Sequence, residues 1–231
     1  MSAFLAVNYR DRIELLTDGA VYTEDGTLVA IREKVFRLSS IPAAITSRGA
    51  MEPLDMIGLY LETVGAFEGS FDATIVHLGS LLGKMKQQGA PAFEMVICGI
   101  SESDGPVIAY FCTAAAYPDF EPYKLYRIEQ PDFGGGAPLD FVAELPAAGI
   151  TAESVRDGLA AKGADFFELM RRKAGPNPLR PDLPPLFGIG GHVDLTVISA
   201  AGVTTTRLRT WPDQVGAKID PFAADVIEEV A

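Results

Sequence analysis

The sequence predicts an α+β fold in which two antiparallel sheets are stacked between helical layers, as a four-layer αββα sandwich. Three observations indicate this fold. Strand-like runs with short turns fill the first fifty residues, two segments of helical periodicity follow, and more strands, another helix and a closing pair of strands complete the order. Many neighbouring strands are joined by short turns, which favours antiparallel sheets.

The first fifty residues are expected to form an antiparallel sheet. The apolar runs Phe4 to Val7 and Ile13 to Thr17 are separated by a polar segment of hairpin length. Asp25-Gly26 is the strongest short turn signal in the chain. Four further strand-like runs lie before and after this turn: Ala20 to Tyr22, Leu28 to Ile31, Lys34 to Leu38 and Ala43 to Thr46.

Two amphipathic helices are expected next. Apolar residues recur every three or four positions from Met51 to Val64, and again from Phe71 to Met85. The remaining expected elements are strands at Met95 to Ile100, Val107 to Cys112 and Lys124 to Ile128, a helix over roughly Ala152 to Lys173, a hairpin of Val193 to Ser199 with Thr204 to Arg209, and a short helix at the chain end.

Length and composition suit one globular domain. Of the 231 residues, 48% are hydrophobic, which is sufficient for a sizeable core. No repeat with a period of about 20 to 50 residues divides the chain, and we expect a single domain over residues 1–231. The proline-rich stretch from Pro176 to Pro185 is expected to be a loop and not a linker between domains.

The charge of the chain argues against nucleic-acid binding. The formal net charge is −12, whereas phosphate binding needs clustered Lys and Arg. The densest basic cluster is Arg171, Arg172 and Lys173, followed by Gly175 and Pro176. Because cations in a last helical turn complement the helix dipole, and Gly and Pro are stop signals, we expect this cluster to close a helix.

We expect a soluble, cytoplasmic protein without a cofactor or a metal ion. No run of about 18 apolar residues and no signal-peptide pattern is present. Cys98 and Cys112 lie in apolar runs and are expected to be buried free thiols. His77 and His192 each lack a second ligand at metal spacing. The glycine-rich loop around Gly134 lacks the Lys-Ser/Thr of a phosphate-binding loop and is expected to be a tight turn.

Ser2 is the residue that points most directly to a function. A small second residue allows removal of the initiator Met1, which leaves a hydroxyl and a free α-amine on one residue, a nucleophile with its own base. Asp18 follows Ser2 by sixteen residues and Lys34 follows it by thirty-two, both at the edges of strand-like runs. Taken singly, Asp18 can be a turn residue before Gly19, and Lys34 a solvated strand residue.

The stretch from Ser2 through Gly49 resembles the β-type subunits of the proteasome and its bacterial relatives, in the N-terminal nucleophile (Ntn) hydrolase superfamily. In that family the mature chain begins with a nucleophilic Thr, or Ser elsewhere in the superfamily. An Asp follows sixteen residues later, and a Lys lies thirty-two residues after the nucleophile, as Asp18 and Lys34 do here. The later segment Gly190-Gly191-His192-Val193-Asp194-Leu195 is similar to the family's Gly-Gly, apolar, Asp segment.

The resemblance implies a hydrolase of peptide or other amide bonds. An α-amine titrates at about 7.7 to 8.0 and can accept the proton of the Ser2 hydroxyl. The Lys34 ammonium would lower the pKa of this amine and favour the forming alkoxide, while the Asp18 carboxylate would hold the lysine charged and oriented. The oxyanion would be bound by a backbone N–H of the turn near Ser47 and Arg48, and Ser47 is the expected donor.

The resemblance also implies a homo-oligomer, of ring-like form in this family, with an ATP-dependent unfoldase as a partner. A second hypothesis is a catalytically inactive subunit of the same fold with a structural or assembly role. In the family, a Ser precedes the late Gly-Gly and an Asp stands three residues earlier, where this chain has Ile189 and Leu186. The loop that supplies a third serine has no hydroxyl here, in Asp132 to Gly136. Retention of Met1 would also leave the nitrogen of Ser2 as an amide, which cannot act as a base.

Overall fold

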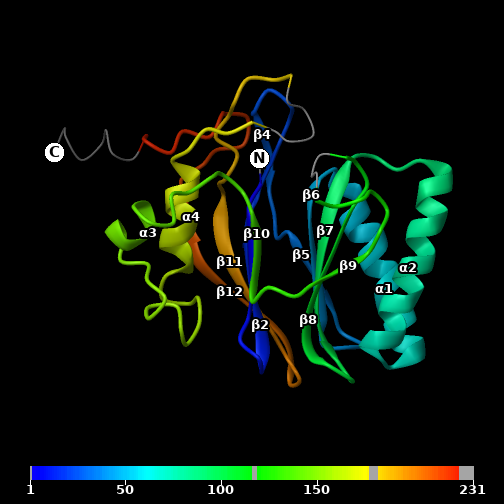
Figure 1. Cartoon of the computed structure of the whole chain (residues 1–231). Coiled ribbons are helices and arrows are strands. Elements are labelled where there is room, and N and C mark those ends of the chain that lie inside the picture. The colour runs from blue at the N-terminus through cyan, green and yellow to red at the C-terminus, as the bar shows by residue number, and fades with distance from the viewer. Residues whose placement is uncertain (1, 116–118, 177–181, 224–231) are drawn as a thin grey trace.

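The computed structural model describes residues 2–115, 119–176 and 182–223. These residues have a mixed α+β fold with three antiparallel sheets and four helices (Figure 1). No helix among them is long and apolar enough to cross a membrane. Cys98 and Cys112 are buried and free, as expected.

One five-stranded sheet joins the two ends of the chain. In spatial order its strands are β10 (Asp132–Gly135), β1 (Phe4–Asn8), β2 (Arg12–Asp18), β11 (His192–Ser199) and β12 (Gly202–Thr210). The antiparallel pairing of β2 with β11 places Asp18 opposite Val193. This register brings the late glycine pair, which directly precedes β11, to the end of β2.

The other five-stranded sheet is built from the middle of the chain. Its strands in spatial order are β5 (Val35–Leu38), β6 (Ala43–Gly49), β7 (Phe93–Ser101), β8 (Gly105–Cys112) and β9 (Tyr126–Ile128). Two short strands, β3 (Ala20–Tyr22) and β4 (Leu28–Ile31), form a separate hairpin. The expectation of one sheet over the first fifty residues is therefore wrong: the β2 ladder ends at Asp18, whose side chain accepts the N–H of Ala20, and the chain crosses to the other sheet.

Helices α1 (Glu52–Glu68) and α2 (Phe71–Gln88) cover one face of this second sheet (Figure 1). Pro53 lies in the first turn of α1, where its missing N–H has no helical partner. The Ser70 hydroxyl caps α2 by accepting the N–H of Ala73. Buried residues at helical spacing, including Leu54, Leu61 and Leu78, pack against the sheet.

The two five-stranded sheets face each other across an apolar cluster. Its members come from both sheets: Phe4, Ala6, Ile13, Leu15 and Ile198 from one, and Val35, Ala44, Val96, Cys98, Ile108, Tyr110 and Cys112 from the other. On the opposite side of β2 and β11, a second cluster packs Leu16 and Leu195 against Phe167 and Met170 of α4 (Gly163–Arg171).

Three expectations for the second half of the chain need correction. The helix expected over Ala152 to Lys173 is reduced to α4, because the N–H of Leu159 donates to the Glu14 carboxylate and not to a helical carbonyl. A short helix, α3 (Glu144–Ala147), was not expected. The glycine-rich segment expected as a tight turn is strand β10, because its backbone pairs with β1.

Two expected elements lie partly or wholly outside the described residues. The loop from Pro176 to Pro185 is described only in part, and the short helix expected at the chain end falls beyond Ala223. By contrast, the basic cluster does close a helix, since α4 ends at Arg171.

Candidate functional site

Ser2, Asp18 and Lys34 lie together at one end of the two sheets. Lys34 Nζ is 2.8 Å from Ser2 Oγ and 3.0 Å from each oxygen of the Asp18 carboxylate. Ser2 lies just before β1, Asp18 is the last residue of β2, and Lys34 directly precedes β5 in the other sheet. The hairpin of β1 and β2 supplies two of the three groups, and the facing sheet supplies the third.

The Asp18 carboxylate is buried and held by backbone N–H groups as well as by Lys34. Oδ1 accepts the N–H of Ala3 at 3.0 Å, and Oδ2 accepts those of Ala20 at 3.1 Å and Gly190 at 3.4 Å. Ala3 and Gly190 lie in the segments that precede β1 and β11, and Ala20 is the first residue of β3. Three parts of the chain therefore fix the position of one carboxylate.

The side chain of Lys34 is almost fully buried, with only 2% of its surface exposed. Burial lowers the pKa of Lys34, the positive charge of Arg48 acts in the same direction, and Asp18 opposes both. The backbone of Lys34 is fixed in turn, because its carbonyl accepts the Thr46 hydroxyl at 2.8 Å. The lysine therefore presents Nζ to Ser2 and Asp18 from a fixed backbone.

Arg48 lies beside Ser2, a position that the sequence did not reveal. Its Nη1 donates to the Ser2 carbonyl at 3.3 Å, and its guanidinium forms an ion pair with Glu94. Glu94 also accepts the Tyr110 hydroxyl at 2.7 Å. In the sequence, Arg48 is notable only because it lies in the expected oxyanion turn, and Glu94 is 46 residues further along the chain.

Ser47, the expected oxyanion donor, lies in β6 opposite Met95. By strand alternation its side chain shares a face with Ala43 and Ile45, which pack toward α1 and α2. The Ser47 hydroxyl is buried and makes no hydrogen bond to any described residue. Ser47 is therefore not joined to the Ser2 cluster by its side chain, and an oxyanion role would rest on its backbone amide.

The backbone of the Gly190-Gly191 pair, far from Ser2 along the chain, contacts the cluster of Ser2, Asp18 and Lys34. Gly190 accepts the N–H of Gly19 at 3.0 Å and donates its own N–H to Asp18. The preceding Ile189 is 1% exposed, within the apolar cluster of α4. The backbone of this segment therefore reaches the site, while the residue at the position of the family's serine carries no hydroxyl.

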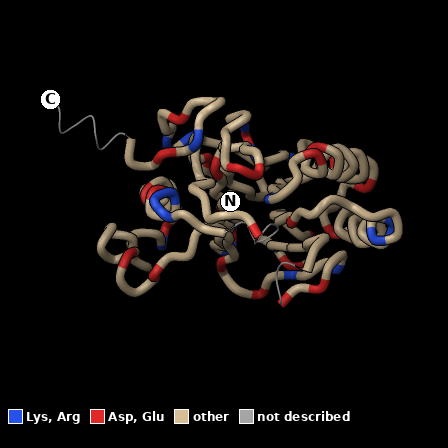
Figure 2. Tube along the Cα trace, turned by 90° about the horizontal axis from the view of Figure 1, so that it is seen from above, with Lys and Arg blue, Asp and Glu red and all other residues tan. Residues whose placement is uncertain are grey.

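The remaining singled-out residues have structural partners. Each cation of the basic cluster pairs with a carboxylate: Arg171 with Asp213, Arg172 with Glu168 and Lys173 with Glu144. Figure 2 shows basic positions scattered among acidic ones along the described trace. His77 pairs with Glu68 across α1 and α2, and the buried His192 lies 3.1 Å from Asp194. Within the described residues, no three His, Cys, Asp or Glu side chains gather as a metal site.

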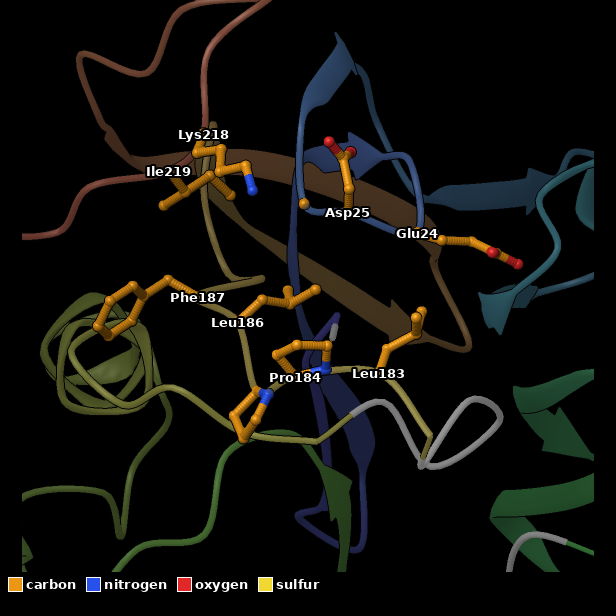
Figure 3. A pocket seen from close by; sticks show the side chains of 10 residues that line it. Glu24, Asp25, Leu183, Pro184, Leu186, Phe187, Lys218 and Ile219 are labelled. Carbon is orange, nitrogen blue, oxygen red and sulfur yellow. The ribbon is translucent and has the colours of Figure 1, made fainter.

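A pocket of about 490 Å³ lies beyond the β3–β4 turn (Figure 3). Its walls are the turn at Glu24 to Gly26, the segment Leu183 to Phe187, and Lys218 with Ile219. None of Ser2, Asp18, Lys34 and Ser47 is among its lining residues. The pocket is therefore separate from the candidate cluster.

No family model matches the sequence, and no curated protein is significantly similar to it. The geometry around Ser2, Asp18 and Lys34 is therefore the basis for a functional assignment.

Proposed function

We propose that this protein is an Ntn hydrolase resembling proteasome β subunits, which cleaves peptide or other amide bonds with Ser2 as the nucleophile after removal of Met1. Met1 itself lies outside the described residues. The observation that carries the proposal is the position of Lys34 Nζ, within hydrogen-bond distance of both the Ser2 hydroxyl and the Asp18 carboxylate. A nucleophile, its charge-stabilising cation and an orienting acid are then in contact.

In the proposed reaction, the free α-amine of Ser2 takes the proton from Oγ as Oγ attacks the carbonyl carbon of the substrate amide. A new C–O bond forms and the negative charge moves to the carbonyl oxygen, which backbone N–H groups bind, with Ser47 as the expected donor. The amine then passes its proton to the leaving nitrogen as the C–N bond breaks. Water, deprotonated by the same amine, cleaves the acyl ester and restores the serine.

Lys34 and Asp18 make this chemistry feasible at neutral pH. A positive Nζ at 2.8 Å from Ser2 Oγ stabilises the developing alkoxide. The same charge lowers the pKa of the α-amine from its ordinary value of about 7.7 to 8.0, so that a larger fraction is neutral. Burial works against the charge on Lys34, and the two Asp18 oxygens at 3.0 Å support it.

The proposal includes the fold of the superfamily, a single four-layer αββα domain. Its support is the packing of α1 and α2 on the β5–β9 sheet, the apolar cluster between the two sheets, and the packing of α4 on β11. It also includes a cytoplasmic location and, as the resemblance implies, an ATP-dependent unfoldase that delivers substrate.

We further propose a homo-oligomer, ring-like as in the resembling family. Met56, Leu59 and Phe67 lie along one side of α1 and are 69%, 62% and 87% exposed. Val76 of α2 is 70% exposed as well. Exposed apolar side chains gathered on neighbouring elements mark an association surface. Sedimentation should give a mass that is a multiple of the 24.7 kDa chain. Phe67→Glu should lower this mass, and a monomeric wild type would contradict the proposal.

A second candidate function is a catalytically inactive subunit of the same fold. The observation that favours it is the apolar character of Ile189 and Leu186, which stand where the resembling family supports the terminal amine with Ser and Asp. Intact-mass spectrometry separates the two candidates first. A mass without Met1 is required for catalysis by Ser2, and quantitative retention of Met1 favours the inactive subunit.

Hydrolysis of fluorogenic peptides and esters is the direct test of the enzyme. Ser2→Ala should abolish turnover, and Lys34→Met should lower it by at least about 100-fold, as loss of a charge-stabilising donor does in other hydrolases. Ser80→Ala is the matched control, because Ser80 is an exposed serine of α2. Equal rates in wild type and Ser2→Ala would exclude Ser2 as the nucleophile.

A further inference from the structure

The Gly190-Gly191 turn is held by a buried ion pair from elsewhere in the chain. Asp213 Oδ2 accepts the N–H of Gly191 at 2.7 Å. Arg171 at the end of α4 donates to both oxygens of Asp213, at 2.8 and 2.7 Å, and Nη1 also donates to the Ile189 carbonyl at 2.9 Å. Arg171 and Asp213 thus bind the backbone on both sides of Gly190.

The ion pair of Arg171 and Asp213 is almost fully buried. The side chains of Arg171 and Asp213 are 3% and 4% exposed. The guanidinium lies 4.8 Å from the centre of the Trp211 ring, whose Nε1–H donates to Glu168. A buried Arg–carboxylate pair with two parallel hydrogen bonds has a defined geometry, since the planar fork fits only one orientation of its partner.

Gly190 is fitted between this pair and the candidate site. A Cβ at Gly190 would lie 2.5 Å from Asp213 Oδ2 and 2.9 Å from Arg171 Nη1. On its other side, the Gly190 N–H reaches Asp18 Oδ2 at 3.4 Å and its carbonyl accepts the N–H of Gly19 at 3.0 Å. The position of the ion pair therefore sets the position of one of the N–H groups that hold Asp18.

We propose that Arg171 and Asp213 are positioning residues for the Ser2, Asp18 and Lys34 site. They hold the glycine turn by its backbone, in a chain where Ile189 and Leu186 offer no polar side chain to do so. The inference rests on the proposed function, because positioning matters only if Asp18 and Lys34 serve Ser2. Neither residue touches the reacting atoms, and both act through the Gly190 amide.

The consequence for the chemistry is a shift in the pH dependence of acylation. If the turn moves and Asp18 loses the Gly190 N–H, the carboxylate draws the Lys34 ammonium more strongly toward itself and away from Ser2. The α-amine of Ser2 then feels less positive charge, its pKa rises, and the reactive neutral form appears only at higher pH. If the ion pair were purely structural, its loss would lower the folded fraction and leave the pH midpoint of acylation unchanged.

The test measures labelling of Ser2 by a β-lactone, followed by intact mass as a function of pH. Asp213→Asn should label about tenfold more slowly than wild type, about 1.4 kcal/mol in activation free energy, with its midpoint shifted to higher pH. Arg171→Lys, which keeps the charge but not the two-pronged contact, should shift it in the same direction. Arg172→Met is the matched control, because Arg172 is the adjacent, half-exposed cation paired with Glu168.

The outcomes separate this inference from the proposed function. An unchanged midpoint in both variants, with labelling reduced only in proportion to the folded fraction seen by near-ultraviolet circular dichroism, overturns the positioning role. Equal labelling of wild type and Ser2→Ala overturns the proposed function instead. Crystal structures of wild type and Asp213→Asn then still decide the geometry: a Gly190 nitrogen that leaves hydrogen-bond distance of Asp18 supports the inference, and an unmoved one refutes it.

Discussion

Replacing Lys34 with methionine should destabilise the protein by several kcal/mol. Lys34 and Asp18 are 2% and 0% exposed, and Nζ contacts both carboxylate oxygens. Removing one partner of a buried ion pair costs about 3 to 5 kcal/mol, because the other charge is left uncompensated. Methionine has a similar length and leaves little empty space. Since three backbone N–H groups still bind Asp18 in the variant, we expect a loss near the lower limit, about 3 kcal/mol.

Urea unfolding measures this loss. With a slope of about 1 to 3 kcal/mol/M, the midpoint should fall by about 1 to 3 M. Lys84→Met is the matched control, because Lys84 is exposed on α2 and its loss should change stability by less than about 0.5 kcal/mol. A loss below about 1 kcal/mol in Lys34→Met would refute the reasoning.

Three further predictions concern pH and packing. Burial lowers the pKa of Lys34 in the folded protein below its ordinary value of 10.5. Between the folded and the unfolded pKa the unfolded chain binds more protons than the folded one, so the free energy of unfolding rises with pH there. If urea unfolding at increasing pH gives a constant difference in this free energy between wild type and Lys34→Met, the prediction is wrong. Gly19→Ala places a Cβ in steric conflict with the His192 ring and should cost about 1 to 3 kcal/mol. His192→Ala should largely restore this loss, and a single variant as stable as wild type would exclude the close contact. Burial raises the pKa of Tyr9 to about 12, so an ultraviolet titration should lose a transition near that pH in Tyr9→Phe, and identical curves would exclude the assignment.

Local patterns sufficed to predict most strands and the first two helices. Hairpins such as β1 with β2 and β7 with β8 are specified by apolar runs and turn residues close together in the chain. The meeting of Ser2 with Asp18 follows from one such hairpin, because its register places Ala3 beside Asp18. The contact with Lys34 requires a second sheet, and there the sequence offered only the spacing shared with a known family.

Long-range contacts account for what the sequence did not predict. From the sequence, Arg171 is expected to be a cation that closes a helix. Nothing near it in the chain indicates that it pairs with Asp213, which is 42 residues away. Strand β10 has a glycine-rich sequence of low strand propensity, and only its pairing with β1 makes it a strand. In the same way α4 is short because Glu14, 145 residues from Leu159, takes the N–H that a longer helix would use.

The pairing of β2 with β11 has a consequence for the time at which the site is assembled during synthesis. Ser2 leaves the ribosome long before Gly190 and Asp213, which complete the surroundings of Asp18. A nascent chain that has not yet reached Asp213 thus carries Ser2 without two of the groups that fix the surroundings of Asp18. Under the proposed function, Ser2 therefore stays inactive until synthesis has passed Asp213.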